Sequence, residues 1–203
     1  MQQDSTRDWI TPRVQSHFLE SAAVFQETAK HCLSAILQAS DLLASRLQLG
    51  GKLMLCGNGG SAADCQHMAA EFVSCLTQDF KRPGLPAVAL TTDTSFLTAY
   101  ANDFGFEGVF ARQIQSIGKS GDVLIGISTS GNSKNVVRAV ETAKDLDIRT
   151  IVLTGAGGCL KDMADIAIAV PSSNTQYIQE THLAIEHTLC DIVERVLFGQ
   201  SGN

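Results

Sequence analysis

The sequence predicts an α/β fold, a three-layer α/β/α sandwich around a five-stranded parallel sheet of the flavodoxin or Rossmann-like kind, preceded by an N-terminal helical hairpin. From residue 51 onward, five short apolar runs rich in Val, Ile and Leu alternate with stretches of helical periodicity. Such runs are typical of strands buried on both faces, and strands that alternate with helices form parallel sheets. The composition agrees, because 44% hydrophobic but only 6% aromatic residues suits an aliphatic core of helices on a sheet.

The first predicted element is helical and ends at Gly50-Gly51. Between Pro12 and Leu49 there is no internal Gly or Pro. Apolar residues recur at three- and four-residue steps, mostly in phase: Phe18, Ala22, Phe25, Ala29, Leu33, Ile36, Leu43 and Leu47. This pattern indicates one amphipathic helix or a pair of them, which cannot bury its apolar stripe alone. We therefore divide the chain into an oligomerisation hairpin at residues 1–50 and an α/β domain at residues 51–203.

The elements of the α/β domain follow in chain order. Strands are expected at residues 53–56, 87–90, 122–127, 150–153 and 166–170. Helices are expected near residues 63–77, in the region up to about 119, near 134–146, as a short turn before the fifth strand, and from about 175 to 198. In folds of this kind ligands bind at the carboxyl ends of the strands.

Composition and charge exclude two classes of function. The 203 residues carry a formal net charge of −6 and no Lys/Arg cluster longer than two, so nucleic-acid binding has no electrostatic support. No apolar segment approaches the ~20 residues of a membrane span, and Met1–Ser5 has no basic-then-apolar signal pattern. The six cysteines form no Cys-x-x-Cys pair, which is typical of a reducing compartment. We expect a cytoplasmic protein.

A glycine-rich segment at residues 57–64 follows the first strand and enters a helix. Glycines let backbone N–H groups approach an anion, and the helix N-terminus adds partial positive charge. The spacing Gly57-x-Gly59-x-x-Ala62 also fits a dinucleotide fingerprint, but the acidic residue expected about 20 positions later is missing. The plainer alternative is a tight turn in which Ser61 caps the helix.

A hydroxyl-rich segment follows the third strand and also enters a helix. Its four hydroxyl residues lie within six positions around one glycine: Ser128, Thr129, Ser130 and Ser133. One hydroxyl would suffice for a helix cap, whereas four at a helix start favour a phosphate-binding cradle.

Two helices carry candidate acid–base or metal-binding side chains. Asp64, His67 and Glu71 share one face of the helix after the glycine-rich segment, where they could bind a metal or transfer protons. The last helix has polar residues in its first turns: Gln179, Glu180, His182, Glu186 and His187. Both sets have a plainer alternative, a solvated helix face, and spacing alone does not choose between His182 and His187.

Five separated motifs, in order, are similar to those of the phosphoheptose isomerases of the sugar-isomerase (SIS) family. They are residues 57–64, His67-x-x-x-Glu71, Asn102-Asp103-x-Gly105, residues 126–133, and Ile178-Gln179-Glu180-x-His182 followed by His187. The resemblance covers about residues 50–198 and, in outline, the N-terminal hairpin. It implies the SIS fold, a homotetramer, and isomerisation of D-sedoheptulose 7-phosphate to D-glycero-D-manno-heptose 7-phosphate for bacterial surface polysaccharide.

The resemblance also implies roles for particular residues. The substrate would be bound by Asn58, Gly59, Gly60, Ser61, Glu71, Asn102, Asp103, Ser128, Thr129, Ser130, Ser133 and Gln179. One Zn²⁺ per subunit would be bound by His67, Glu71, Gln179 and His187, which selects His187 over His182. For the proton transfers we assign Glu71 as the base and His187 as the acid, with Asp64 relaying a proton or orienting His67.

The chain departs from the family pattern at two places. Cys75 stands where members often carry an Arg, and the segment after it, at residues 77–81, is slightly longer than is usual in the family. Gln176 stands where a carboxylate is common. The alternative function is that of SIS-fold tetramers that bind the bacterial replication initiator without catalysis. Those usually lack the Glu in the first helix, so the presence of Glu71 favours the enzyme. We further expect the active site to be shared between subunits.

Overall fold

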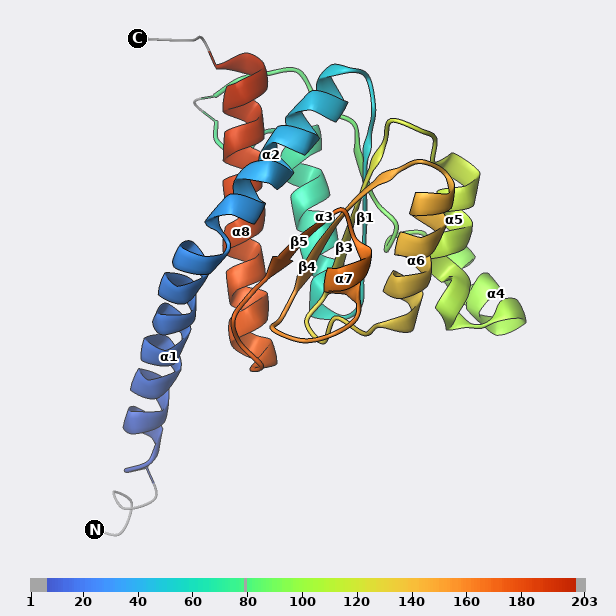
Figure 1. Ribbon diagram of the computed structural model, residues 1–203. Coiled ribbons are helices and arrows are strands. Elements are labelled where there is room, and N and C mark those ends of the chain that lie inside the picture. The colour runs from blue at the N-terminus through green and yellow to red at the C-terminus, as the bar shows by residue number, and fades with distance from the viewer. Residues whose placement is uncertain (1–6, 79, 200–203) are drawn as a thin grey trace.

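Five strands form one fully parallel sheet in the order β2-β1-β3-β4-β5 (Figure 1). The computed structural model describes residues 7–78 and 80–199, so Met1–Ser5 lie outside the described residues. The strands are β1 Leu53–Gly57, β2 Ala87–Ala89, β3 Val123–Ser128, β4 Arg149–Thr154 and β5 Ile166–Ala169. Because β1 and β3 are buried at every position, they read as continuous apolar runs, and the predicted parallel sheet is confirmed.

Helices cover both faces of the sheet. They are α1 Ile10–His31, α2 Leu33–Gln48, α3 Gly60–Val73, α4 Thr94–Phe104, α5 Val109–Ile117, α6 Lys134–Asp145, α7 Leu160–Met163 and α8 Thr175–Phe198, with a short 3₁₀ turn at Phe106–Gly108. Side chains of α2, α3 and α8 build the core on one face, and those of α4, α5, α6 and α7 build it on the other. Among the described helices, none is both long and apolar enough to cross a bilayer.

The two N-terminal helices are joined at a single residue. Cys32 keeps a right-handed helical backbone between α1 and α2, and its N–H still donates to the carbonyl of Thr28. The connection is therefore a bend and not a loop, and Figure 1 shows α1 extending beyond the sandwich in continuation of α2. Leu43 and Leu47 of the predicted stripe are buried in the α2–α8 core, whereas Phe18 stays 70% exposed.

The glycine-rich segment lets α3 begin directly at the end of β1. Gly59 has a φ of +58°, a left-handed backbone that glycine adopts without strain, and the helix starts at the next residue. We predicted this helix near residues 63–77, so it begins and ends earlier than expected. The early end places Glu71 in the last turn of α3 and not in its middle.

Candidate active site

Two loops meet where the direction of strand order changes. The loop after β1 and the loop after β3 leave adjacent parallel strands at their carboxyl ends, with β2 on one side and β4 on the other. Chain connections from β1 and β3 run to opposite faces of the sheet, α3 on one and α6 on the other. A strand order of this type leaves a crevice at that point, where ligands of doubly wound folds bind.

A pair of asparagines ties the two loops together. Asn58 donates to the Asn135 side-chain oxygen at 2.9 Å, and Asn135 donates back to that of Asn58 at 2.8 Å. Asn135 is buried in the first turn of α6. The pair fixes Asn58, a predicted substrate residue, against the loop that carries the hydroxyls. Our sequence analysis missed Asn135, although an Asn beside a hydroxyl-rich segment at a helix start was a usable signal.

Three of the four predicted hydroxyls gather at the end of β3. The Ser128 hydroxyl lies 2.9 Å from that of Ser133 and 3.4 Å from that of Ser130. Thr129 lies in the same turn, and its carbonyl accepts from the Gly155 N–H. On the neighbouring loop Ser61 is buried in the first turn of α3, where Gly59 and not Ser61 occupies the N-cap position. Clustered hydroxyls at the start of α6 can donate to an anion together with the helix N-terminus.

Imidazole and carboxylate side chains converge between α3 and α8. The Nε2 atoms of His67 and His187 lie 2.8 Å apart, and Glu71 Oε1 lies 3.7 Å from His67 Nε2. The His67 side chain is 42% exposed and that of Glu71 is 19% exposed, so a ligand can reach the group. All three side chains belong to one chain. The structure therefore brings together the proposed acid, the proposed base and a second histidine.

Gln179 lies against the glycine-rich loop. A Cβ on Gly60 would stand 2.5 Å from the Gln179 Nε2 atom, so any other residue at this position would displace the amide. Gln179 stands two turns before His187 on α8 and joins that helix to the start of α3. The predicted substrate residues Gly59 and Gly60 thus border the same crevice as Gln179.

Glu186 contributes a buried carboxyl group and Asp64 a half-buried one, with Asp64 close to both Glu186 and His67. Glu186 is fully buried, and neither of its oxygens has a partner among the described residues. Burial raises the pKa of Glu186 to about 9, and the Asp64 carboxylate nearby adds to the shift. Burial also raises the pKa of Asp64, with His67 acting in the opposite direction. Asp64 Oδ2 has no partner among the described residues, so the expected orientation of His67 by Asp64 is not seen as a hydrogen bond.

His182 is a buried structural histidine. Its Nε2–H donates to the carbonyl of Thr154 at 3.1 Å and so ties α8 to the end of β4. Burial lowers the pKa of His182 to about 4, although this hydrogen bond works against the shift. His187 and not His182 is the histidine of α8 that faces His67.

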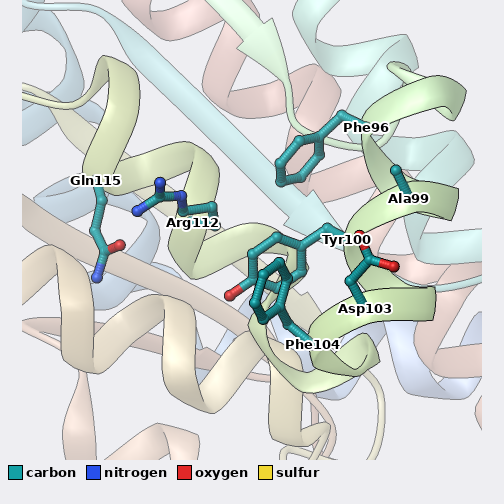
Figure 2. A pocket seen from close by; sticks show the side chains of 7 residues that line it. All are labelled: Phe96, Ala99, Tyr100, Asp103, Phe104, Arg112 and Gln115. Carbon is teal, nitrogen blue, oxygen red and sulfur yellow. The ribbon is translucent and has the colours of Figure 1, made fainter.

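Asn102 and Asp103 lie apart from the other predicted site residues. Both stand near the end of α4, which packs on the opposite face of the sheet from α3 and α8, and they hydrogen-bond each other at 2.9 Å. Figure 2 shows Asp103 beside the neighbouring rings of Tyr100 and Phe104, which are tilted against each other, with Arg112 of α5 facing the same hollow. Within one chain these two residues do not meet Glu71 or His187.

The two loops offer hydroxyls and backbone N–H groups that can donate to an anion, and the His–Glu–His group offers side chains that can transfer protons. Comparisons with known proteins identify the family. A sequence model described as "SIS domain" matches residues 17–155. The phosphoheptose isomerase of Roseiflexus sp. (strain RS-1) is 47% identical over 196 residues, 96% of each chain.

Solved structures give the same result. The phosphoheptose isomerase structure from Neisseria gonorrhoeae matches with a TM-score of 0.85 and 45% identity, covering 91% of this chain and 98% of that one. The structure from Francisella tularensis matches with a TM-score of 0.87 and 41% identity over the same shares. On this combination of sequence identity, coverage and fold, the chain belongs to the phosphoheptose isomerase family of SIS-domain proteins.

Proposed function

We propose that this chain interconverts D-sedoheptulose 7-phosphate and D-glycero-D-manno-heptose 7-phosphate, the first step towards activated heptose for bacterial surface polysaccharide. The observation that carries the proposal is the juxtaposition of His67, His187 and Glu71 at the α3–α8 interface. The alternative, a non-catalytic tetramer that binds the replication initiator, receives no support from these relatives, and Glu71 is present.

The reaction moves one proton between carbons and one between oxygens. Glu71 removes a proton from C1 of the open-chain ketose while His187 donates a proton to the carbonyl oxygen at C2, which gives an enediol. Glu71 then returns its proton to C2, and the hydroxyl on C1 gives its proton back to His187, which leaves the aldose. Each positioned acid or base contributes about 10²–10⁴-fold to the rate.

The hydroxyl-rich loop would hold the phosphate at the other end of the sugar. Ser128, Ser130 and Ser133 offer three neighbouring donors, and the N-terminus of α6 favours an anion. Binding energy from this remote group orients C1 and C2 against Glu71 and His187. Asn58 and the backbone of Gly59 and Gly60 would lie along the hydroxyl-bearing carbons of the sugar, between its phosphate and its C1 and C2 atoms.

The chemistry of the side chains at the α3–α8 interface would suit a zinc ion, although no three of the described His, Cys, Asp or Glu side chains are already arranged as a metal site. The two imidazole nitrogens are 2.8 Å apart, close to the roughly 3.3 Å between two nitrogen ligands of tetrahedral zinc, and a carboxylate lies beside them. We propose that His67, Glu71, His187 and the Gln179 amide bind one Zn²⁺ per chain. The ion would polarise the sugar oxygens and stabilise negative charge on them.

Metal analysis tests this proposal. The purified protein should contain about one zinc per chain, and His67→Ala should lose it while keeping the fold. Absence of zinc from the parent, together with activity that a chelator leaves unchanged, would count against the assignment.

Two further properties complete the proposal. Exposed apolar side chains on α1, among them Phe18 and Leu19, need a partner surface, which supports a homotetramer built on the N-terminal helices. All six cysteines are free thiols in the described structure, which supports a cytoplasmic location.

The deciding experiment for the proposed activity incubates the protein with sedoheptulose 7-phosphate and analyses the sugars formed. Failure to produce an aldoheptose 7-phosphate with or without added zinc would overturn the proposed activity.

A further inference from the structure

We propose that Arg82 and Glu194 form a positioning clamp that sets the rate of the chemical step by fixing Glu71 relative to His187, without contacting the sugar. The proposal rests on the roles given to Glu71 and His187 above. It assigns a function to a buried ion pair that the proposed chemistry does not itself use.

The clamp is a buried ion pair in which all three guanidinium nitrogens of Arg82 donate hydrogen bonds. Arg82 lies between α3 and β2, and its side chain is 0% exposed, against 3% for Glu194 of α8. Arg82 Nε and Nη2 donate to Glu194 Oε1 at 2.8 Å and 2.6 Å. Such a pair is held in one geometry, because moving either charge away from the other inside the protein is costly.

The remaining donors of Arg82 hold the end of α3. Nη2 donates to the backbone carbonyl of Glu71 at 2.7 Å, and Nη1 donates to that of Phe72 at 2.7 Å. The last carbonyls of a helix have no partner within the helix, and a cation there is also favoured by the helix dipole. Glu194 Oε1 additionally accepts from the N–H of Leu76, so the chain leaving α3 is tied to α8 as well.

These contacts join the two helices that carry the proposed acid and base. Glu194 stands seven residues after His187 on α8, two turns along nearly the same face. The Glu71 backbone is bonded to Arg82, and Arg82 is bonded to Glu194. The spacing between Glu71 and His187 is therefore set by a direct chain of short hydrogen bonds as well as by apolar packing. A displacement of about 1 Å at a reacting group can cost about 100-fold in rate.

The test separates positioning from stability. Removing one partner leaves a buried charge without compensation, so single apolar variants are expected to unfold. Replacing both partners by apolar residues of similar volume, in Arg82→Met with Glu194→Met, leaves no such charge and should keep the fold. We expect kcat to fall about 10- to 100-fold, with KM for sedoheptulose 7-phosphate and the zinc content close to those of the parent.

Arg195→Gln is the matched control. It breaks an exposed ion pair with Asp191 on the same helix and touches no part of α3, so kcat should stay at the parental value. Arg82→Lys keeps the charge but loses the forked donors, and it decides the question if the double variant does not fold. We expect it to lower kcat at constant KM.

A folded double variant, or a folded Arg82→Lys variant, with parental kcat would overturn the clamp. A fall in kcat accompanied by a comparable rise in KM would also overturn the clamp, because general loosening of the site predicts that both constants change. Glu71→Gln measured in parallel keeps the two proposals apart. If that variant turns over normally, the base assignment fails, whereas a loss of kcat in the clamp variants alone still supports control through the α3–α8 spacing.

Discussion

Glu71 and His187 come from helices that are more than a hundred residues apart in sequence, and both lie beside His67. A carboxylate in this position, only 19% exposed, can take a proton from carbon while an imidazole serves the oxygens. The chemistry assigned to the site depends on these two side chains more than on any others.

Glu71→Gln should remove the base without removing the side chain. The amide keeps the size and one oxygen but cannot accept a proton at neutral pH, so kcat should fall by about 10²–10⁴-fold. Turnover of sedoheptulose 7-phosphate measures the effect, and circular dichroism checks the fold. Glu107→Gln, which breaks an exposed ion pair with Lys134, is the control. Near-parental turnover of Glu71→Gln would rule out the base assignment.

His182 makes a second prediction, about pH and stability. Its pKa is about 4 in the folded chain and near 6.5 when unfolded, so the unfolded state binds a proton first as pH falls. The stabilisation by neutral His182 is thus complete above pH 6.5 and is lost towards pH 4. Between pH 7 and pH 5 the loss is about 2 kcal/mol. His182→Gln, which can still donate to Thr154, should escape it.

The measurement compares the two proteins. Glu186, with a pKa of about 9, shifts stability in the opposite sense over the same range, so the parent alone mixes two effects. Urea unfolding at pH 7 and pH 5, at equal chain concentration, gives the difference between His182→Gln and the parent. The variant should gain about 2 kcal/mol relative to the parent on going to pH 5. An unchanged difference would contradict the pKa assigned to His182.

Residues on one helix show what the sequence could not decide. His182 and His187 are five positions apart, about 140° around the helix, so periodicity places them on different faces without saying which face meets α3. Only the packing of α8 against β4 turns His182 inward to Thr154 and His187 towards His67. The same packing buries Glu186, whose polar character indicated a surface or site position.

At the scale of elements, the strands were predictable and the ends of α3 were not. Apolar β-branched runs require burial on both faces, which fixes a parallel sheet and leaves ligand loops at its carboxyl edge. The start of α3 depends on the left-handed backbone of Gly59, and its end is capped by Arg82, nine residues beyond the last helical residue. Such a contact has no signal in local sequence.

The loop after β3 is the element that should govern affinity. Ser128→Ala combined with Ser130→Ala removes two donors and leaves Glu71 and His187 untouched. Hydrogen bonds to a charged group are worth about 1.5–3 kcal/mol each, so KM for the sugar phosphate should rise about 100-fold or more. Inhibition by inorganic phosphate should weaken in parallel. Ser120→Ala, which loses an exposed bond to Asp147, is the control, and an unchanged KM in the double variant would refute the cradle.

At the scale of the whole molecule, one chain leaves two features incomplete. No described residue covers the exposed apolar face of α1, and Asn102 and Asp103 lie across the sheet from the His–Glu–His group. Sequence resemblance places these two residues in the substrate site, whereas a single chain keeps them out of it. A closed tetramer in which α4 of one chain reaches the crevice of another would satisfy both observations.

Mixed tetramers test this arrangement. Glu71→Gln and an Asn102→Ala, Asp103→Ala double variant should each be inactive alone. If α4 serves a neighbouring site, joint unfolding and reassembly restores sites that combine a native Glu71 with a native Asn102 and Asp103. For random assembly from equal amounts, about a quarter of the sites qualify, and about a quarter of parental activity should return.

The matched control mixes Glu71→Gln with His187→Ala. Glu71 and His187 lie beside the same His67 within one chain, so every site in that mixture keeps one defect and the mixture should stay inactive. Mass spectrometry verifies that the tetramers are mixed. If the first mixture also stays inactive although mixed tetramers have formed, Asn102 and Asp103 do not serve a neighbouring site. Activity in the control mixture would instead show that Glu71 and His187 act from different chains.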